Sequence, residues 1–263
     1  MTEIAPGVTL VLAHNPGPMT LDGTNTWILG SAAHGAPGGP SLVVDPGPLD
    51  EGHLRRVHEV AGEVAEIVLT HRHLDHSEGV ARLAELTGSG VRAADPAYAV
   101  PAAGCDGRLD DGQDLQVGDV AIRVLATPGH TSDSTSLLVT SPDGRWLLTG
   151  DMVLGRGTTV ITHPDGDLGR YLESLEVLLT AVREHDVTAI LPGHGPVVTD
   201  PERLLLFYRE HRQQRLEQVR DSLRRGDTTP AQVVARVYAD VDRSVWPAAE
   251  QSVRAQLDYL RGC

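Results

Sequence analysis

The sequence predicts an α/β protein that carries a small helical domain at its C-terminal end. Short apolar runs with the composition of strands alternate with amphipathic helical patterns up to about residue 200. Beyond that point the strand pattern stops, and three helical segments follow one another. The length of 263 residues suits one large domain with an appendage, and it is enough to bury a core without disulfides.

The expected strands are short, and glycine and proline separate many of them. They fall at residues 24–29, 41–47, 66–70, 91–94, 120–127, 134–140, 145–150 and 187–193. Amphipathic patterns predict helices over 50–61, 79–87 and 167–182. A stretch rich in Gly, Ala and Pro at 31–39 separates the first two strands, and we expect it to form a mobile hairpin loop.

The C-terminal helical region begins with residues that are typical of a helix N-terminus. Asp200 suits the N-cap position and Pro201 the first helical position. Two further helices are expected to start near Pro230 and Trp246. The predicted domains are therefore 1–200 and 201–263. The apolar face of the long helix is compatible with a homodimer, although no pattern in the sequence requires one.

Charge and cysteine content narrow the classes of function. The formal net charge of −14, from 22 basic and 36 acidic residues, argues against broad adhesion to nucleic acid or to anionic membranes. A local basic groove is still compatible with this charge. The two cysteines, Cys105 and Cys263, have no metal-binding or redox spacing. The sequence shows neither the pattern of a secretory signal nor an apolar run long enough to span a membrane. We therefore expect a cytoplasmic protein without membrane contact.

The stretch THRHLDHSEG at 70–79 crowds titratable side chains directly after an apolar run. On an extended strand end, His71 and His73 point to the same side. The chain then turns, so Asp75 and His76 can face a second point. A solvated loop would also account for this composition, but imidazole and carboxylate are the ligands that zinc prefers.

Three other strand ends supply the ligands that this stretch lacks. ATPGHT places His130 after one strand, LLTGD places Asp151 after another, and ILPGHG places His194 after a third. Glycine beside these residues permits tight turns and a close approach of the backbone to a bound ion. Since sites in layered α/β proteins assemble at strand ends, we expect these side chains to meet.

The motifs HRHLDH, PGHT, TGD and LPGHG resemble the signature of the metallo-β-lactamase superfamily over about residues 1–200. The resemblance implies a four-layer αββα sandwich with two divalent metal ions. Zinc is the default metal, with iron or manganese as alternatives. The family pattern assigns the ligands as follows: His71, His73 and His130 to one ion, Asp75, His76 and His194 to the other, and Asp151 to both.

Further features narrow the resemblance. The bridging Asp151 and the absence of a cysteine ligand resemble the glyoxalase-II-like and ribonuclease-Z-like branches. The stretches NPGPMTLDGTNTWILG, VVDPGP, GRGTTVI and LPGHGPV resemble the lactamase-β-2-like branch, which includes an animal endoribonuclease. The helical tail resembles a winged-helix module. Because the third helix is expected to end near Leu260, we expect no β-wing, which argues against nucleic-acid binding by the tail.

We therefore expect a metal-dependent hydrolase in which a dinuclear site supplies the attacking hydroxide, with Asp75 as ligand and catalytic orienter of that hydroxide. The branch resemblance favours a phosphodiesterase or endoribonuclease acting on RNA. A glyoxalase-II-like thioesterase or a lactonase acting on small molecules is the alternative. An alternative of another class is a non-catalytic binding module with a structural metal. The complete set of ligands argues against it, since structural sites are usually closed.

Three residues are candidates for contact with the substrate. Arg156 follows the Asp151 strand end and could bind an anionic substrate, His163 could protonate the leaving group, and Asn25 could shape the mouth of the site. Each has a structural alternative, as a surface residue or as part of a satisfied turn. Arg212 and Arg215, on the long helix, are predicted to lie on its solvated face.

Overall fold

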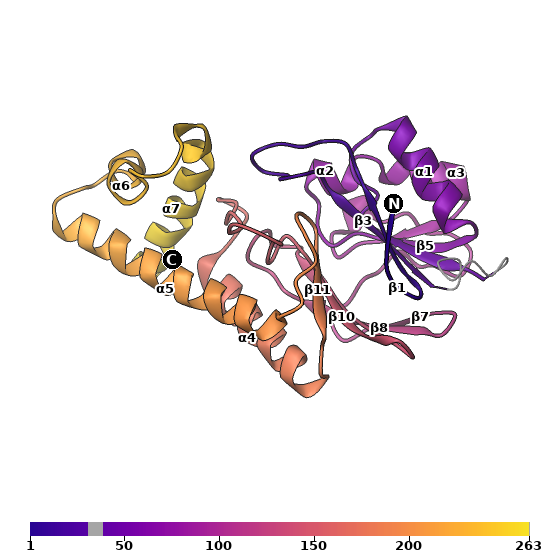
Figure 1. Cartoon of the computed structure of the whole chain (residues 1–263). Coiled ribbons are helices and arrows are strands. Elements are labelled where there is room, and N and C mark those ends of the chain that lie inside the picture. The colour runs from indigo at the N-terminus through magenta and orange to yellow at the C-terminus, as the bar shows by residue number, and fades with distance from the viewer. Residues whose placement is uncertain (31–38, 263) are drawn as a thin grey trace.

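Two β-sheets pack face to face in the computed structural model of the chain, and helices cover their outer faces (Figure 1). The structure describes residues 1–30 and 39–262. The predicted hairpin loop at 31–39 therefore lies almost wholly outside the described residues. The predicted α/β class and four-layer αββα order are confirmed.

The first sheet is built by the N-terminal part of the chain. Its strands, in spatial order, are β1 (Thr2–Ala5), β2 (Val8–Leu12), β3 (Asn25–Gly30), β4 (Ser41–Val44), β5 (Val64–Val68) and β6 (Gly90–Arg92). The β4–β5 and β5–β6 pairs are parallel. The helices that accompany this sheet are α1 (Glu51–Ala61), the short α2 (Leu74–Ser77) and α3 (Val80–Thr87). A short 3₁₀ turn, η2 (Pro96–Tyr98), follows β6.

The second sheet has the order β11-β10-β9-β8-β7. Its strands are β7 (Asp114–Val117), β8 (Val120–Ala126), β9 (Thr135–Ser141), β10 (Gly144–Gly150) and β11 (Ala189–Pro192). In β8 the buried positions Val120, Ile122 and Val124 alternate with exposed ones, as expected for a strand with one face on the core. β10 and β11 run parallel because α4 (Leu168–Glu184) connects them as a crossover helix.

Three layers of apolar contact hold the sandwich together. Between the sheets, side chains such as Trp27 and Val68 of the first sheet meet Leu137 and Leu148 of the second. Leu54 and other side chains of α1 and α3 pack on the outer face of the first sheet. Residues of α4 cover the outer face of the second sheet. The strands β9, β10 and β11 are mostly buried on both faces, whereas β7 and β8 expose alternate residues. Polar side chains therefore gather at the strand ends.

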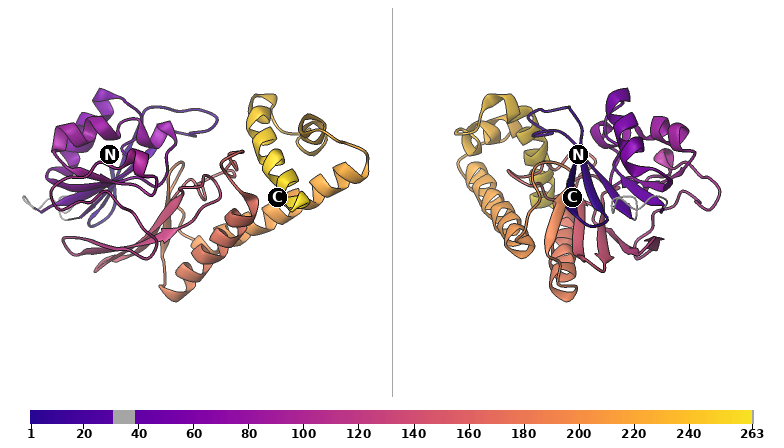
Figure 2. Two further views of the ribbon diagram at one scale, coloured as in Figure 1. Left: turned by 180° about the vertical axis from the view of Figure 1, so that it is seen from behind. Right: turned by 45° about the vertical axis from the view of Figure 1, so that its right-hand side comes forward.

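The C-terminal helices are α5 (Pro201–Arg224), α6 (Pro230–Val237) and α7 (Trp246–Arg261), with the 3₁₀ turn η3 (Arg243–Val245) before α7. The predicted start signal is confirmed, because the Asp200 side chain accepts a hydrogen bond from the Arg203 N–H and Pro201 opens the helix. The first half of α5 packs against α4, and its second half packs with α6 and α7 (Figure 2). The described residues 201–262 contain no strand.

No helix in the described part of the chain is both long and apolar enough to cross a membrane.

Tyr208 on α5 supports the loop that follows β10, because its hydroxyl accepts a hydrogen bond of 2.8 Å from the backbone N–H of Leu154. We expect Tyr208→Phe to lower the free energy of unfolding by about 1–2 kcal/mol, since the substitution leaves a buried donor without a partner. Urea denaturation measures the change. Tyr259→Phe is the matched control at an exposed tyrosine of α7. Equal stability of the two variants would contradict the assigned role of Tyr208.

Candidate metal centre

The polar side chains predicted to form a site do meet, at one end of the sandwich. The chain leaves β5 and reaches His71, leaves β8 and reaches His130, leaves β10 and reaches Asp151, and leaves β11 and reaches His194. β5 belongs to the first sheet and the other three strands to the second. The site is therefore assembled by both sheets, and the packing between them sets its dimensions.

The first group of potential ligands consists of His71, His73, His130 and Asp151, whose ligand atoms lie within 4.8 Å of one another. His73 Nδ1 lies 3.1 Å from His71 Nε2 and 3.0 Å from His130 Nε2. An Asp151 carboxylate oxygen lies 3.9 Å from His130 Nε2. Such spacings are close to the edges of a zinc tetrahedron, which are about 3.3 Å for bonds of about 2.0–2.1 Å.

The second group consists of Asp75, His76 and His194. His194 Nε2 lies 3.2 Å from His76 Nε2 and 3.0 Å from Asp75 Oδ2. Asp151 reaches this group as well, with Oδ2 at 3.4 Å from His194 Nε2 and Oδ1 at 3.5 Å from His76 Nε2. The Asp151 carboxylate thus lies between the two groups, where one oxygen could serve each of two ions.

Hydrogen bonds on the outer side of the imidazoles fix which nitrogen faces the centre. The Nδ1 atoms of His76, His130 and His194 lie 2.8, 2.6 and 3.0 Å from acceptor oxygens of Asp45, Val160 and Gly23. The Thr70 hydroxyl donates to Asp45, so its oxygen is free to accept from His71 Nδ1 at 3.1 Å. A neutral imidazole that donates its N–H through Nδ1 has a lone pair on Nε2. In these histidines Nε2 faces the centre, as it does in histidines that bind a metal.

Unshared electron pairs about 3 Å apart repel unless a cation lies between them. The Asp151 carboxylate adds to this repulsion, because its Oδ1 is buried and has no hydrogen-bond partner among the described residues. Burial favours the neutral acid, but His194 and His76 hold the pKa of Asp151 well below its usual range. The chemistry and spacing of these donors fit divalent metal ions.

The pKa values of the two histidines in the second group also indicate that positive charge is stabilised there. Burial disfavours the charged form of His76, but Asp75, Asp151 and Asp45 together raise its pKa well above the ordinary value. For His194, too, burial is outweighed by Asp151 and Asp75, and its pKa rises to about 9. His130, where burial dominates, has its pKa lowered to about 4. The neighbouring carboxylates therefore stabilise positive charge at His76 and His194.

Two glycines lie so close to the candidate ligands and their neighbours that a side chain would not fit at either position. A Cβ atom at Gly193 would lie 2.5 Å from Asp151 Oδ1 and 2.7 Å from His76 Cε1. At Gly150, a Cβ atom would lie 2.5 Å from Thr70 Oγ1, and the backbone has the left-handed φ of +48°. Any larger residue at these positions would displace a candidate ligand or its support.

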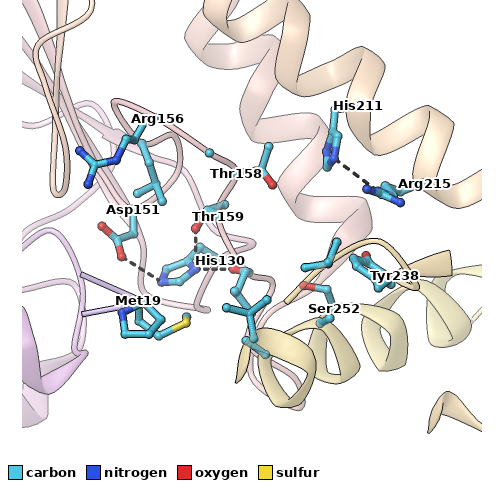
Figure 3. Close-up of a pocket in the computed structure, with 18 of the residues that line it drawn as sticks. Met19, His130, Asp151, Arg156, Thr158, Thr159, His211, Arg215, Tyr238 and Ser252 are labelled. Carbon is cyan, nitrogen blue, oxygen red and sulfur yellow. Dashed lines mark hydrogen bonds and ion pairs between the residues drawn. The ribbon is translucent and has the colours of Figure 1, made fainter. Parts of the chain in front are cut away.

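A cavity of about 360 Å³ opens beside the first group and extends to the C-terminal helices (Figure 3). His130 and Asp151 line one end of it. Arg156 lies at its edge, where it forms an ion pair with Asp22, with Nη2 at 2.9 Å from Oδ1. Arg156 is thus near the site, as expected, but a carboxylate of the chain already neutralises it.

The structure gives Asn25 a different place from the expected one at the mouth of the site. Its side chain is 1% exposed, and Nδ2 donates to the carbonyl oxygens of Pro192 and Gly195, both at 2.9 Å. Asn25 therefore lies behind the centre and fixes the turn that carries His194. The expectation of direct substrate contact is corrected accordingly, because both N–H groups are used inside the protein.

His163 also lies elsewhere than expected. Its Nε2 is 3.1 Å from Asp258 Oδ2 on α7, and it lines a separate cleft with Leu257 and Arg254. It is not among the described residues that line the cavity beside Asp151. A role as proton donor to the leaving group is therefore not supported. Arg212, by contrast, is only 3% exposed and lines the cavity, where a solvated helix face was expected.

Comparison with known proteins agrees with this geometry. Residues 19–194 match the sequence profile described as Metallo-beta-lactamase superfamily, and residues 229–261 match that of the Beta-lactamase associated winged helix domain. The fold and the histidine–aspartate centre thus define a protein of the metallo-β-lactamase class.

The chain belongs to the metallo-β-lactamase superfamily. It is 32% identical to the Beta-lactamase-like protein 2 homolog of Caenorhabditis elegans, over 98% of this chain and 85% of that one. It is 34% identical to an Atrochrysone carboxyl ACP thioesterase of Aspergillus chevalieri, over 92% of this chain and 77% of that one. The crystal structure of a Beta-lactamase domain protein from Burkholderia ambifaria superposes with a TM-score of 0.79 at 25% identity, covering 99% and 88% of the two chains. The C-terminal domain is a winged-helix domain by the same comparison.

The clearance at Gly193 is directly testable. We expect Gly193→Ala to weaken zinc binding by at least about 10-fold, because the added methyl group displaces Asp151 or His76, and losses of this order follow when ligands are misaligned. Competition with a chromophoric chelator measures the affinity. Gly169→Ala on α4 is the control, since its Cβ would lie no closer than 3.2 Å to a neighbouring side chain. Unchanged affinity in Gly193→Ala would contradict the prediction that Asp151 and His76 bind the metal.

Proposed function

We propose that the protein is a hydrolase that uses two divalent metal ions, zinc by the preference of its donors, to cleave acyl thioesters or related esters. The observation that carries the proposal is the shared position of Asp151 between two groups of inward-facing ligands. In this proposal His71, His73 and His130 hold one ion, Asp75, His76 and His194 hold the other, and Asp151 bridges them. Bound ions would supply Lewis-acid activation of a carbonyl group and a water of lowered pKa.

Asp75 is the ligand best placed to act on the attacking water. Its side chain is 29% exposed, whereas those of His76 and His194 are almost completely buried. Burial favours its neutral form, but His76 and His194 keep its pKa below the usual value, so it is a carboxylate near neutral pH. A partly exposed carboxylate beside the ions can accept a hydrogen bond from the water and orient it towards the substrate.

The cavity supports an acyl substrate. Beside the first ligand group it is lined by apolar side chains that include Met19, Leu21 and Leu154, and Val241 and Val245 continue this lining towards α7. An apolar chain could lie there while its carbonyl group faces the ions. Relatives named as ACP thioesterases act on thioesters by their names, which supports the same class of substrate for this chain.

RNA or another phosphodiester is the competing substrate. The resemblance to the lactamase-β-2-like branch favoured it, and the net charge of −14 argues against it. A purely structural metal site would leave no open cavity beside the ligands, whereas His130 and Asp151 line one here. Thioester hydrolysis is therefore the preferred reaction, and the experiment below compares it with hydrolysis of the other substrates.

Asp75→Ala should lower kcat/KM for a simple acyl thioester by about 10²–10⁴-fold, the range for loss of a general acid or base. The assay compares an N-acetylcysteamine thioester, a lactone, a bis-aryl phosphodiester and single-stranded RNA on zinc-loaded protein. Asp119→Ala, at an exposed turn, is the control. Full activity of Asp75→Ala with metal still bound would contradict the role of Asp75. Cleavage of RNA alone would overturn the proposed substrate class.

A further inference from the structure

The cavity beside the candidate centre has a second, cationic end. One end is formed by His130 and Asp151, and the other by side chains of α5 and α7. Figure 3 shows His211 and Arg215 extending from α5 towards Tyr238, with Ser252 of α7 nearby. A ligand that fills the cavity would touch the candidate centre and the C-terminal helices at the same time.

Two arginines at this end lack an acidic partner, in contrast to other arginines of the same helix. On α5, Arg209 pairs with Glu176, and Arg220 pairs with Glu217. None of the ion pairs found among the described residues involves Arg212 or Arg215. Asp151 is the only acidic side chain among the described residues of the cavity lining, and it belongs to the candidate metal centre. A chain with 36 acidic residues thus leaves two cations unpaired in one cavity.

Arg212 is buried and only partly satisfied. Its guanidinium lies over the Tyr171 ring at 4.9 Å, and Nη2 donates to the Thr159 carbonyl oxygen at 2.5 Å. Its Nε has no partner among the described residues. Burying a guanidinium without a counter-charge is costly, so its position favours an anion in the cavity beside it.

Arg215 and His211 add free donors. Arg215 Nη1 donates to Gln218 and to the Val237 carbonyl oxygen, while its Nη2 makes no hydrogen bond to the described part of the chain. Arg215 Nε lies 3.5 Å from His211 Nε2, and because an arginine N–H can only donate, this long contact favours His211 Nε2 as the acceptor. The proton of a neutral His211 ring then sits on Nδ1, and this buried atom also has no partner in the residues described.

We propose that His211, Arg212 and Arg215 form a subsite for an anionic group, a carboxylate or a phosphate, carried by the substrate whose reacting carbonyl lies at the metal centre. This proposal rests on the proposed function and specifies its substrate class as a charged acyl thioester. Guanidinium groups match the planar or tetrahedral oxygens of both anions. Arg156 is excluded as the receiving group because Asp22 already neutralises it.

Non-hydrolysable thioether analogues test the subsite by binding alone. One pair compares a hexyl chain with a chain that ends in a carboxylate, which places the charge on the acyl side. The other pair compares pantetheine with 4′-phosphopantetheine, which places the charge on the leaving group. Calorimetry on zinc-loaded protein should show one charged analogue binding about 10–100-fold more tightly than its neutral partner, as expected for charge-assisted hydrogen bonds.

Arg215→Gln should remove this advantage, and Arg220→Gln should retain it. Arg215→Lys, which keeps the charge, should retain part of it. Because Arg215 also holds the end of α6 through Val237, melting temperatures are compared, and His211→Gln gives a second variant without that contact. The proposal is overturned if neither charged analogue is preferred, or if the preference survives in both Arg215→Gln and His211→Gln.

Kinetics on the matching thioesters separates this proposal from the proposed function. If the charged analogue binds through Arg215 but no thioester is hydrolysed, the anion subsite holds and the proposed reaction fails. If thioesters are hydrolysed with no preference for charge, and Arg215→Gln leaves kcat/KM unchanged for all of them, the reaction holds and the subsite fails.

Discussion

The site depends on an electrostatic constraint: lone pairs and carboxylates are packed together where the two sheets end. Asp45 is central to this arrangement. Its buried carboxylate accepts hydrogen bonds from the Thr70 N–H and hydroxyl and lies 2.8 Å from His76 Nδ1. It therefore joins the ends of β4 and β5 to the second ligand group. The packing of the sandwich keeps mutually repelling groups about 3 Å apart, and bound cations would supply the compensating charge.

The same constraint explains why the loops at the site are rich in glycine and closely packed. Gly193 lies against Asp151 and His76, so the centre tolerates little displacement of its backbone. Asn25 and Trp27 of β3 both donate to the Pro192 carbonyl oxygen, which ties the first sheet to the turn before His194. In the proposed function, a different part of the chain contacts the remainder of the substrate. Residues of α5 and α7 line the cavity, and none of them is a candidate metal ligand.

The sequence predicted the strands that carry the ligands, because an apolar run followed by a polar residue and glycine is a local signal. The structure brings all seven predicted ligands together, although their binding of metal stays a prediction. Strands β1, β2 and β7 were not predicted. β1 and β7 have only four residues each, and no residue of β1 is buried, so periodicity hardly distinguishes them from loops.

The residues that the structure places differently from their expected functional positions are those whose contacts are distant in sequence. Asn25 contacts residues about 170 positions away, and Arg212 contacts Thr159, on the other side of α4 in sequence. His163 is held by Asp258 on the last helix. No local pattern reveals such contacts. The placement of α5 against the cavity, which follows from its packing on α4, converts an expected solvated arginine into a buried one.

The number of metal ions bound per chain tests the central claim most directly. Protein dialysed with excess zinc, desalted and analysed by mass spectrometry of the metal should contain about two ions per chain, as a dinuclear centre requires. Asp151→Ala should lose metal from both groups, because its carboxylate faces each of them. A correctly folded protein that holds one ion or none under these conditions would contradict the proposed dinuclear centre.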